Sequence, residues 1–294
     1  MRTAVVTGAG SGLGRAIAAE LAGRGYRVHV TDVDAGAADR VAAELGNEAR
    51  GSALDVRDEA ACRGLADSIG RTGSLDLWVN NAGVFFSGVP WEQSAERRQT
   101  MLDVNVTGLM NGTIAALGPM RAAGKGHIVN VVSLAGIVAA PGEVAYSASK
   151  HAAIAFTLGT QMDLRRSGIK RIHLSAVCPD GIFTPMLEDK LDDPDAAPSF
   201  SGRLLTAEGV AKEVGRLTER PRPILIVPRW RGPFLRFVDV FPRLSLRLLP
   251  LVMADARRRQ RRYKEADRVG PLALTELRPC GRRPPLCPAP GPRW

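Results

Sequence analysis

Residues 2–21 read RTAVVTGAGSGLGRAIAAEL and contain three predicted elements in order: a short apolar strand (2–7), a glycine-rich turn and an alanine-rich helix. The turn, Thr7-Gly8-Ala9-Gly10-Ser11-Gly12-Leu13-Gly14, is spaced G-x-x-x-G-x-G rather than G-x-G-x-x-G. Glycines let the backbone approach a pyrophosphate closely, and the first turn of a helix offers unpaired N–H groups to that anion. Strand, turn and helix together predict a dinucleotide-binding unit.

The end of the second predicted strand (27–31) indicates which dinucleotide binds. Asp32 follows that strand, eighteen residues after Gly14, where an acidic side chain accepts hydrogen bonds from the adenosine ribose. An Asp at a strand end can also simply begin a turn. A carboxylate there repels a 2′-phosphate, and the glycine turn contains no Arg or Lys that would attract one. Asp32 therefore predicts NAD rather than NADP.

Further apolar segments alternate with helical stretches along most of the chain. Hydrophobic residues make up 45% of the 294, which is enough for a buried core. Strands alternating with helices predict one α/β domain built on a Rossmann-like, doubly wound parallel sheet of about seven strands. The expected strands are residues 2–6, 27–30, 50–54, 75–79, 127–132, 171–177 and 224–228.

Tyr146 and Lys150 are the first candidates for chemistry. They are four residues apart, so both side chains share one face of a helix. An ammonium group beside a phenol favours the phenolate and moves its pKa toward a useful range. A Tyr and a Lys at this spacing are more often surface residues, so the catalytic interpretation depends on the other motifs.

Taken together, these motifs resemble the short-chain dehydrogenase/reductase family over residues 2 to about 228. Residues 7–14 resemble the family's TGxxxGxG turn, and Asn80-Asn81-Ala82-Gly83 its NNAG motif. Asn105 matches the family's catalytic Asn in the long central helix, and Ser133 lies thirteen residues before Tyr146, the family's usual spacing for the catalytic Ser. Leu54-Asp55-Val56 resembles the segment whose Asp contacts the adenine.

The resemblance implies a role for each matched residue. Tyr146 would exchange a proton with the substrate oxygen, and Ser133 would hydrogen-bond that oxygen. Lys150 would lower the pKa of Tyr146 and hold the nicotinamide ribose, while Asn105 would hold a water in a proton relay. The cofactor would contact Gly8, Ser11, Gly12, Leu13, Gly14, Asp32, Asp55, Val56, Asn81, Ala82, Gly83, Tyr146, Lys150, Pro179, Ile182 and Thr184.

One segment departs from the family pattern. Residues 179–186 resemble the PGxxxTxM segment over the nicotinamide, but Asp180 occupies the usual glycine position. Thr184 and Met186 stay in register, so the fold is expected to survive, with Asp180 a turn residue facing water; a carboxylate beside the nicotinamide could also be functional.

The substrate pocket is expected to be apolar, which suggests a lipophilic secondary alcohol or ketone. In the family the pocket is lined by segments after NNAG, after the catalytic Ser and after the PGxxxTxM segment. Residues 188–201 are expected to form a mobile lid. The residues expected beside the substrate are Ser133, Tyr146, Phe85, Leu134, Phe183 and Met186, with Val84, Phe86, Ile137, Val138 and Leu187 around them.

The four Cys and four His residues show no metal-ligand spacing, so neither a metal site nor a disulfide framework is expected. The chain begins directly at the first strand, and we expect a cytoplasmic enzyme. The resemblance also implies a homodimer or homotetramer, formed through the helices that carry Asn105 and Tyr146.

The positive charge is concentrated after residue 220. Residues 221–294 hold 17 Lys/Arg and 5 Asp/Glu, so the net charge of +10 comes from this part and the rest is close to neutral. That distribution argues against specific nucleic-acid binding by the main domain (1–230). Residues 231–268 are expected to form an apolar and basic extension that Pro242 and Pro250 break into short helices, and 269–294 a disordered tail rich in Pro and Arg.

The role of this extension stays open at the level of sequence. Its longest uncharged run, 248–254, is far shorter than the ~20 residues that span a bilayer. The extension could lie in an anionic membrane interface, pack on the enzyme or on another subunit, or bind nucleic acid nonspecifically. Two alternatives to a dehydrogenase also remain: a catalytically silent dinucleotide-binding protein acting through this extension, and an epimerase or dehydratase that recycles the hydride.

Overall fold

The computed structural model describes residues 1–46 and 48–269, and its centre is a parallel sheet of seven strands. Their order across the sheet is β3-β2-β1-β4-β5-β6-β7, and every neighbouring pair is parallel. This confirms the predicted fold class. The strands are β1 (Arg2–Thr7), β2 (Tyr26–Asp32), β3 (Arg50–Ala53), β4 (Leu77–Asn80), β5 (Gly126–Val131), β6 (Ile172–Pro179) and β7 (Ile224–Val227).

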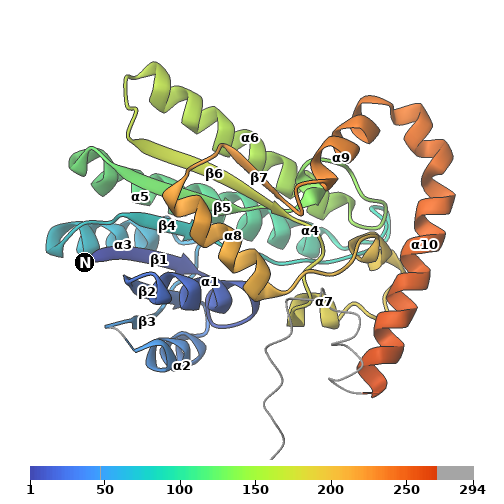
Figure 1. Ribbon diagram of the computed structural model, residues 1–294, viewed down its shortest axis with the longest axis horizontal. Coiled ribbons are helices and arrows are strands. Elements are labelled where there is room, and N and C mark those ends of the chain that lie inside the picture. The colour runs from blue at the N-terminus through green and yellow to red at the C-terminus, as the bar shows by residue number, and fades with distance from the viewer. Residues whose placement is uncertain (47, 270–294) are drawn as a thin grey trace, which may run out of the picture.

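Helices cover both faces of the sheet (Figure 1). Side chains of α1, α2 and α8 pack in one buried cluster, and those of α3, α5 and the end of α6 pack in another. The central helices are α1 (Gly12–Gly23), α2 (Ala35–Leu45), α3 (Glu59–Thr72), α4 (Ala95–Leu102), α5 (Leu109–Ala123), α6 (Val144–Arg166) and α8 (Ala207–Glu219).

The sheet order places the functional end of the domain. After β3 the chain returns to β4, which lies on the other side of β1, so the order reverses between β1 and β4. Ligands of open α/β sheets bind outside the carboxyl ends of the strands at such a switch point. The glycine turn after β1 and the NNAG segment after β4 both lie at this point.

The segment after β6 contains two short helices, α7 (Pro185–Glu188) and the 3₁₀ helix η3 (Pro194–Phe200). The segment expected to be a lid is therefore folded. A buried apolar cluster joins it to α10, including Leu187, Phe200 and Tyr263. Its mobility stays a prediction.

The C-terminal extension forms two helices, α9 (Arg231–Val240) and α10 (Pro242–Val269), which project from one end of the sheet (Figure 1). A break at Pro242 is confirmed, but the expected break at Pro250 is wrong because α10 continues through it. Pro250 removes one helical hydrogen bond, to the carbonyl of Leu246. Both residues are exposed, so water can satisfy that carbonyl. Residues 270–294, with the tail predicted to be disordered, lie outside the described residues.

Candidate active site

The glycine turn leaves the N-terminus of α1 open. Ser11 is its N-cap and makes no side-chain hydrogen bond to the helix, and the first turn holds no acidic residue. The N-cap side chains of α2, α3, α4 and α8 all accept such a bond. Uncapped N–H groups at a helix end are suited to a phosphate, so the helix that follows the predicted pyrophosphate turn has the required form.

Two glycines in the turn lie too close to neighbouring backbone atoms to carry a Cβ atom. A Cβ atom at Gly14 would lie 2.2 Å from the carbonyl oxygen of Gly8 and 2.5 Å from Asn81 Nδ2. Gly8 has a φ of +62°, and a Cβ atom there would lie 2.7 Å from Ala82 Cα. The turn is therefore packed directly against the NNAG segment, which explains why glycine is needed here.

Hydrogen bonds join these two segments. Asn81 Nδ2 donates to the carbonyl oxygens of Thr7 and Gly8, at 3.0 and 2.9 Å. The Thr7 hydroxyl accepts from the backbone N–H groups of Asn81 and Ala82, both at 3.1 Å. The floor of the site is thus held rigidly by residues that the sequence had singled out.

Asp32 lies at the end of the pocket that is predicted to hold the adenosine. Its Oδ2 accepts a hydrogen bond from the Gly10 N–H at 2.9 Å, and its Oδ1 accepts from the Asp34 N–H at 3.1 Å. Asp32 therefore both shapes the glycine turn and presents a carboxylate at the end of β2. Asp55 follows β3, and a hydrogen bond from Arg57 holds the pKa of its carboxyl below the usual value.

One pocket of about 1050 Å³ runs from this floor to the helices of the extension. Of the residues predicted to act in the site or to surround the substrate, four are not part of its lining: Asn105, Phe183, Phe86 and Ile137. Phe183 packs beside the buried cluster under α10, and its assignment to the substrate stays a prediction. The predicted residues that line the pocket are Gly8, Ser11, Gly12, Leu13, Gly14, Asp32, Asp55, Val56, Asn81, Ala82, Gly83, Val84, Phe85, Ser133, Leu134, Val138, Tyr146, Lys150, Pro179, Ile182, Thr184, Met186 and Leu187.

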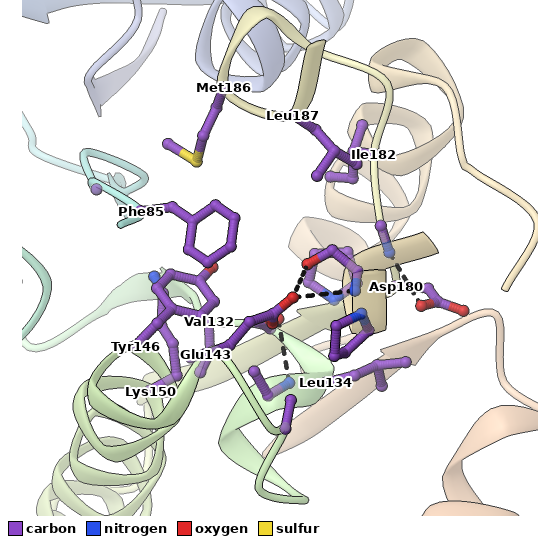
Figure 2. Close-up of a pocket in the computed structure, with 18 of the residues that line it drawn as sticks. Phe85, Val132, Leu134, Glu143, Tyr146, Lys150, Asp180, Ile182, Met186 and Leu187 are labelled. Carbon is purple, nitrogen blue, oxygen red and sulfur yellow. Dashed lines mark hydrogen bonds between the residues drawn. The ribbon is translucent and has the colours of Figure 1, made fainter. Parts of the chain in front are cut away.

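Tyr146 lies on the first turn of α6, with its ring next to that of Phe85 (Figure 2). The two ring centroids are 4.8 Å apart. Burial raises the pKa of Tyr146, the nearby Glu143 raises it further, and a hydrogen bond with Ser133 lowers it. The effect of burial therefore outweighs the lowering of the Tyr146 pKa that was expected from Lys150. Ser133 itself starts the 3₁₀ helix η2 (Leu134–Gly136), where its hydroxyl accepts from the Ala135 N–H at 3.1 Å.

Lys150 is buried one helical turn after Tyr146. Its Nζ lies 5.6 Å from the centre of the Tyr146 ring and donates to the carbonyl oxygen of Val131 at 3.3 Å. Burial lowers the pKa of Lys150 to about 8. The shared helix face inferred from the sequence is thus observed, and it points into the pocket.

Asn105 lies behind Lys150, in the π-helical segment η1 (Asp103–Gly108) between α4 and α5. Its Oδ1 accepts from the Val84 N–H at 2.8 Å, and its Nδ2 donates to the Val84 carbonyl at 2.9 Å and to Ser149 Oγ at 3.1 Å. A Cβ atom at Gly83 would lie 3.2 Å from Asn105 Oδ1 and 3.6 Å from Lys150 Nζ. π-Turns within helices often occur at functional sites.

Two buried carboxylates in the lining of the pocket, Glu143 and Asp180, were not predicted correctly from the sequence. Glu143 is 3% exposed, and it accepts hydrogen bonds from the N–H and hydroxyl of Ser199, at 3.0 and 2.7 Å (Figure 2). Burial raises its pKa to about 7. No sequence motif marked Glu143, although its place one turn before Tyr146 puts it near the same face.

Asp180 does not face water. Its side chain is 7% exposed and forms an ion pair with Arg231 at the start of α9, with Oδ2 3.0 Å from Nε. Arg231 Nη2 also donates to Ser201 Oγ at 3.1 Å. The expectation of a solvated turn residue is wrong because α9 brings a cation over the carboxylate. Burial raises the pKa of Asp180, and Arg231 opposes that rise.

Among residues 1–46 and 48–269, no cluster of His, Cys, Asp and Glu could hold a metal ion, and no helix is long and apolar enough to cross a membrane. Cys62 and Cys178 are free thiols and are buried. The open helix end, the close-packed glycines and the Asp32 carboxylate fit a dinucleotide.

Comparisons with known proteins identify the family of the chain. Residues 2–195 match the short chain dehydrogenase family, and the chain belongs to that family of oxidoreductases. It is 36% identical over 222 residues to 2-(R)-hydroxypropyl-CoM dehydrogenase of Xanthobacter autotrophicus, covering 72% of this chain and 88% of that protein. Other relatives are named as dehydrogenases of alcohols or diols.

Two solved structures share the fold. A short chain dehydrogenase/reductase from Burkholderia phymatum in complex with NAD is 30% identical, with a TM-score of 0.74 over 83% of this chain and 95% of that one. A putative NAD(P)-dependent gluconate 5-dehydrogenase from Beutenbergia cavernae, with bound NADP, is 30% identical, with a TM-score of 0.66 over 77% of this chain and 94% of that one.

Proposed function

We propose that this protein is an NAD-dependent dehydrogenase that interconverts a lipophilic secondary alcohol and its ketone. One observation carries the proposal: Ser133, Tyr146 and Lys150 line the same pocket as the glycine turn after β1. The proposed proton-transferring group and the proposed hydrogen-bond donor would then share one cavity with the proposed dinucleotide site. The relatives named as alcohol and diol dehydrogenases support the reaction class.

The proposed chemistry divides between the cofactor and the chain. Nicotinamide, when bound, supplies hydride transfer to or from the substrate carbon. Tyr146 takes the hydroxyl proton during alcohol oxidation and returns it to the carbonyl oxygen during reduction. The Ser133 hydroxyl donates a hydrogen bond to the same oxygen and stabilises the charge that develops on it.

Lys150 is proposed to support the Tyr146 phenolate and to hold the nicotinamide ribose. Burial opposes ionisation of Tyr146, while an ammonium 5.6 Å from the ring favours it. Because the pKa of Lys150 is about 8, the group can carry or release a proton near neutral pH. Asn105, held by Val84 and Ser149, is proposed to position a water that links Lys150 to solvent.

The substrate class follows from the pocket wall. Phe85, Leu134, Val138, Met186 and Leu187 surround the space beside Tyr146. Such a wall favours burial of hydrocarbon. Glu143 is a polar residue of the same lining, and its Oε1 already accepts two hydrogen bonds from Ser199.

NAD is proposed over NADP because Asp32 presents its carboxylate where a 2′-phosphate would lie. Solved relatives are described with NAD and with NADP, so the argument rests on this residue. A homodimer or homotetramer and a cytoplasmic location are proposed with the activity.

The proposal is tested by titrating the purified chain with NADH and NADPH, followed by a panel of lipophilic secondary alcohols with absorbance read at the reduced-nicotinamide band. We expect tighter binding of NADH and turnover of some panel members. Tyr146→Phe should lower turnover by about 10²–10⁴-fold with NADH affinity nearly unchanged. Tyr26→Phe, which changes a buried Tyr far from the pocket, is the matched control.

Two results would contradict the proposal. Turnover retained in Tyr146→Phe would remove Tyr146 from its role. NADH binding without turnover across a broad panel would favour the catalytically silent dinucleotide-binding protein.

A further inference from the structure

The C-terminal arm, defined as residues 230–266, concentrates the exposed apolar surface of the molecule. Of the 18 large apolar side chains exposed among the described residues, ten lie between residues 230 and 252. Monomeric soluble proteins rarely expose a contiguous apolar patch of this kind unless it binds something. The ten are Trp230, Phe234, Phe237, Val240, Phe241, Leu244, Leu246, Leu248, Leu251 and Val252.

The far half of the arm is anchored to the body, so the apolar half is held in place. Gln260 Nε2 donates to the carbonyl oxygens of Lys190 and Asp193, at 2.8 and 2.7 Å. The Tyr263 hydroxyl accepts from the Leu204 N–H at 3.1 Å. Before Ala256, in contrast, the residues of α10 are exposed or half-buried. The exposed apolar surface therefore belongs to an ordered, attached element (Figure 1).

The arm is also strongly basic. It contains ten Lys/Arg and three Asp/Glu, whereas residues 1–220 are nearly neutral. Arg243, Arg247, Arg258 and Arg261 share one stripe of α10 at helical spacing, and all are exposed. The ion pairs of the described residues include none of these four; those in this part of the chain use Arg231, Arg259 and Lys264.

The exposed apolar side chains and the arginine stripe together indicate what the C-terminal arm binds. A helix with a wide apolar face beside an arginine stripe suits the interface of an anionic bilayer, where the apolar side chains enter the acyl boundary and the cations face the headgroups. A second copy docked arm to arm would bring two positive arms together, which is unfavourable. Nucleic acid would match the arginines but would leave the apolar side chains uncovered.

The arm also forms part of the pocket. Phe234, Phe237, Phe241, Leu244 and Leu248 line the same cavity as Ser133 and Tyr146. We propose that the C-terminal arm docks on an anionic membrane surface and opens the pocket toward it. If the proposed function holds, an apolar substrate would then enter from the bilayer rather than from bulk water.

The test is cosedimentation of the full chain with phosphatidylcholine vesicles, with and without phosphatidylglycerol, in the absence of substrate. The chain should bind the anionic vesicles, and added salt should weaken that binding. Val240→Asp/Leu246→Asp changes exposed apolar residues that do not line the pocket, and should weaken binding about tenfold or more. Trp91→Asp, at an exposed site in the loop after β4, is the control and should bind like wild type.

A second measurement starts from the wild-type chain and adds only conservative Trp→Phe variants. Brominated phosphatidylcholine, mixed with phosphatidylglycerol, should quench tryptophan emission of the wild-type chain. Trp230→Phe should lose that quenched component and Trp91→Phe should keep it. NADH affinity, measured in parallel, shows whether each variant is folded.

Three results would overturn the proposal. The first is wild-type chain that binds neither vesicle. The second is binding of Val240→Asp/Leu246→Asp to the anionic vesicles as tightly as wild type. The arginines alone would then account for the binding, as they would on a DNA duplex. The third is a wild-type oligomer that Val240→Asp/Leu246→Asp dissociates while no vesicle binding is found, which would make the arm a subunit interface. None of these outcomes depends on turnover, so the proposed function can fail or hold separately.

Discussion

The ion pair between Asp180 and Arg231 yields the sharpest prediction about stability. It joins the end of β6 to the start of α9, and its two side chains are 7% and 11% exposed. Asp180→Asn keeps the shape and can still accept the Gly181 N–H bond, observed at 3.0 Å. It cannot neutralise Arg231, so a cation would remain buried without a counter-charge.

The expected loss of stability in Asp180→Asn follows from the burial of this ion pair. Removing one partner of a buried ion pair destabilises a protein by about 3–5 kcal/mol. Because asparagine keeps the volume and the bond from the Gly181 N–H, we expect the lower end, about 3 kcal/mol in the free energy of unfolding. For a domain of this size that corresponds to a fall in Tm of roughly 6–12 °C.

The assay is reversible urea unfolding of a double-mutant cycle with Asp180→Asn, Arg231→Met and both together. Apolar replacement of a whole buried pair is often nearly neutral, so the double variant should recover much of the loss. Asp163→Asn breaks an ion pair with Arg166 on the surface, where the side chains are 70% and 83% exposed, and should cost less than about 1 kcal/mol.

The reasoning is refuted if Asp180→Asn costs no more than Asp163→Asn. It is equally refuted if the cycle shows no coupling between Asp180 and Arg231, because the two would then act independently.

Three further predictions concern the pocket. Gly14→Ala should abolish NADH binding, because its Cβ atom would lie 2.2 Å from the Gly8 carbonyl oxygen. Gly64→Ala is the control and should leave the NADH titration unchanged, because a Cβ atom there meets nothing within 4 Å. Equal NADH affinities of the two variants would contradict this prediction. Asp32→Arg should shift the ratio of NADH to NADPH affinity toward NADPH, and an unchanged ratio would remove Asp32 from cofactor choice. The free energy of unfolding of Glu143→Gln should increase relative to that of wild type as pH rises. The pKa of Glu143 is about 7 in the folded protein against 4.5 ordinarily, so wild type loses stability across that window while glutamine stays neutral and can still accept from Ser199. Urea unfolding near pH ~5 and ~8 checks this, and a pH-independent difference would count against it.

The fold was predictable because its signals are local. The strand, glycine turn and helix of residues 2–21 are contiguous, and each later strand carries its own apolar run. The predicted start of β4 at Leu75 was two residues early, since Leu75 is buried but the ladder begins at Leu77. Such ends depend on which neighbouring strand is available for pairing.

Much of the candidate site was predictable for a related reason. The carboxyl ends of parallel strands meet at one edge, so motifs that follow β1, β4, β5 and β6 must converge there. Tyr146 and Lys150 share a helix face through spacing alone. The packing of Phe183 could not be predicted, because side-chain direction in an irregular loop is set by its neighbours, here the cluster under α10.

By itself, then, the sequence determined the order of elements, the glycine turn and the positions of Ser133, Tyr146 and Lys150 near one strand edge. Only the tertiary structure decided that Arg231 pairs with Asp180, that Ser199 holds Glu143, and that the C-terminal arm forms a wall of the pocket. These partners are separated by 51 and 56 residues in the chain. Whether a charged side chain is solvated or buried against a partner depends on how distant segments pack, and no local pattern records that packing.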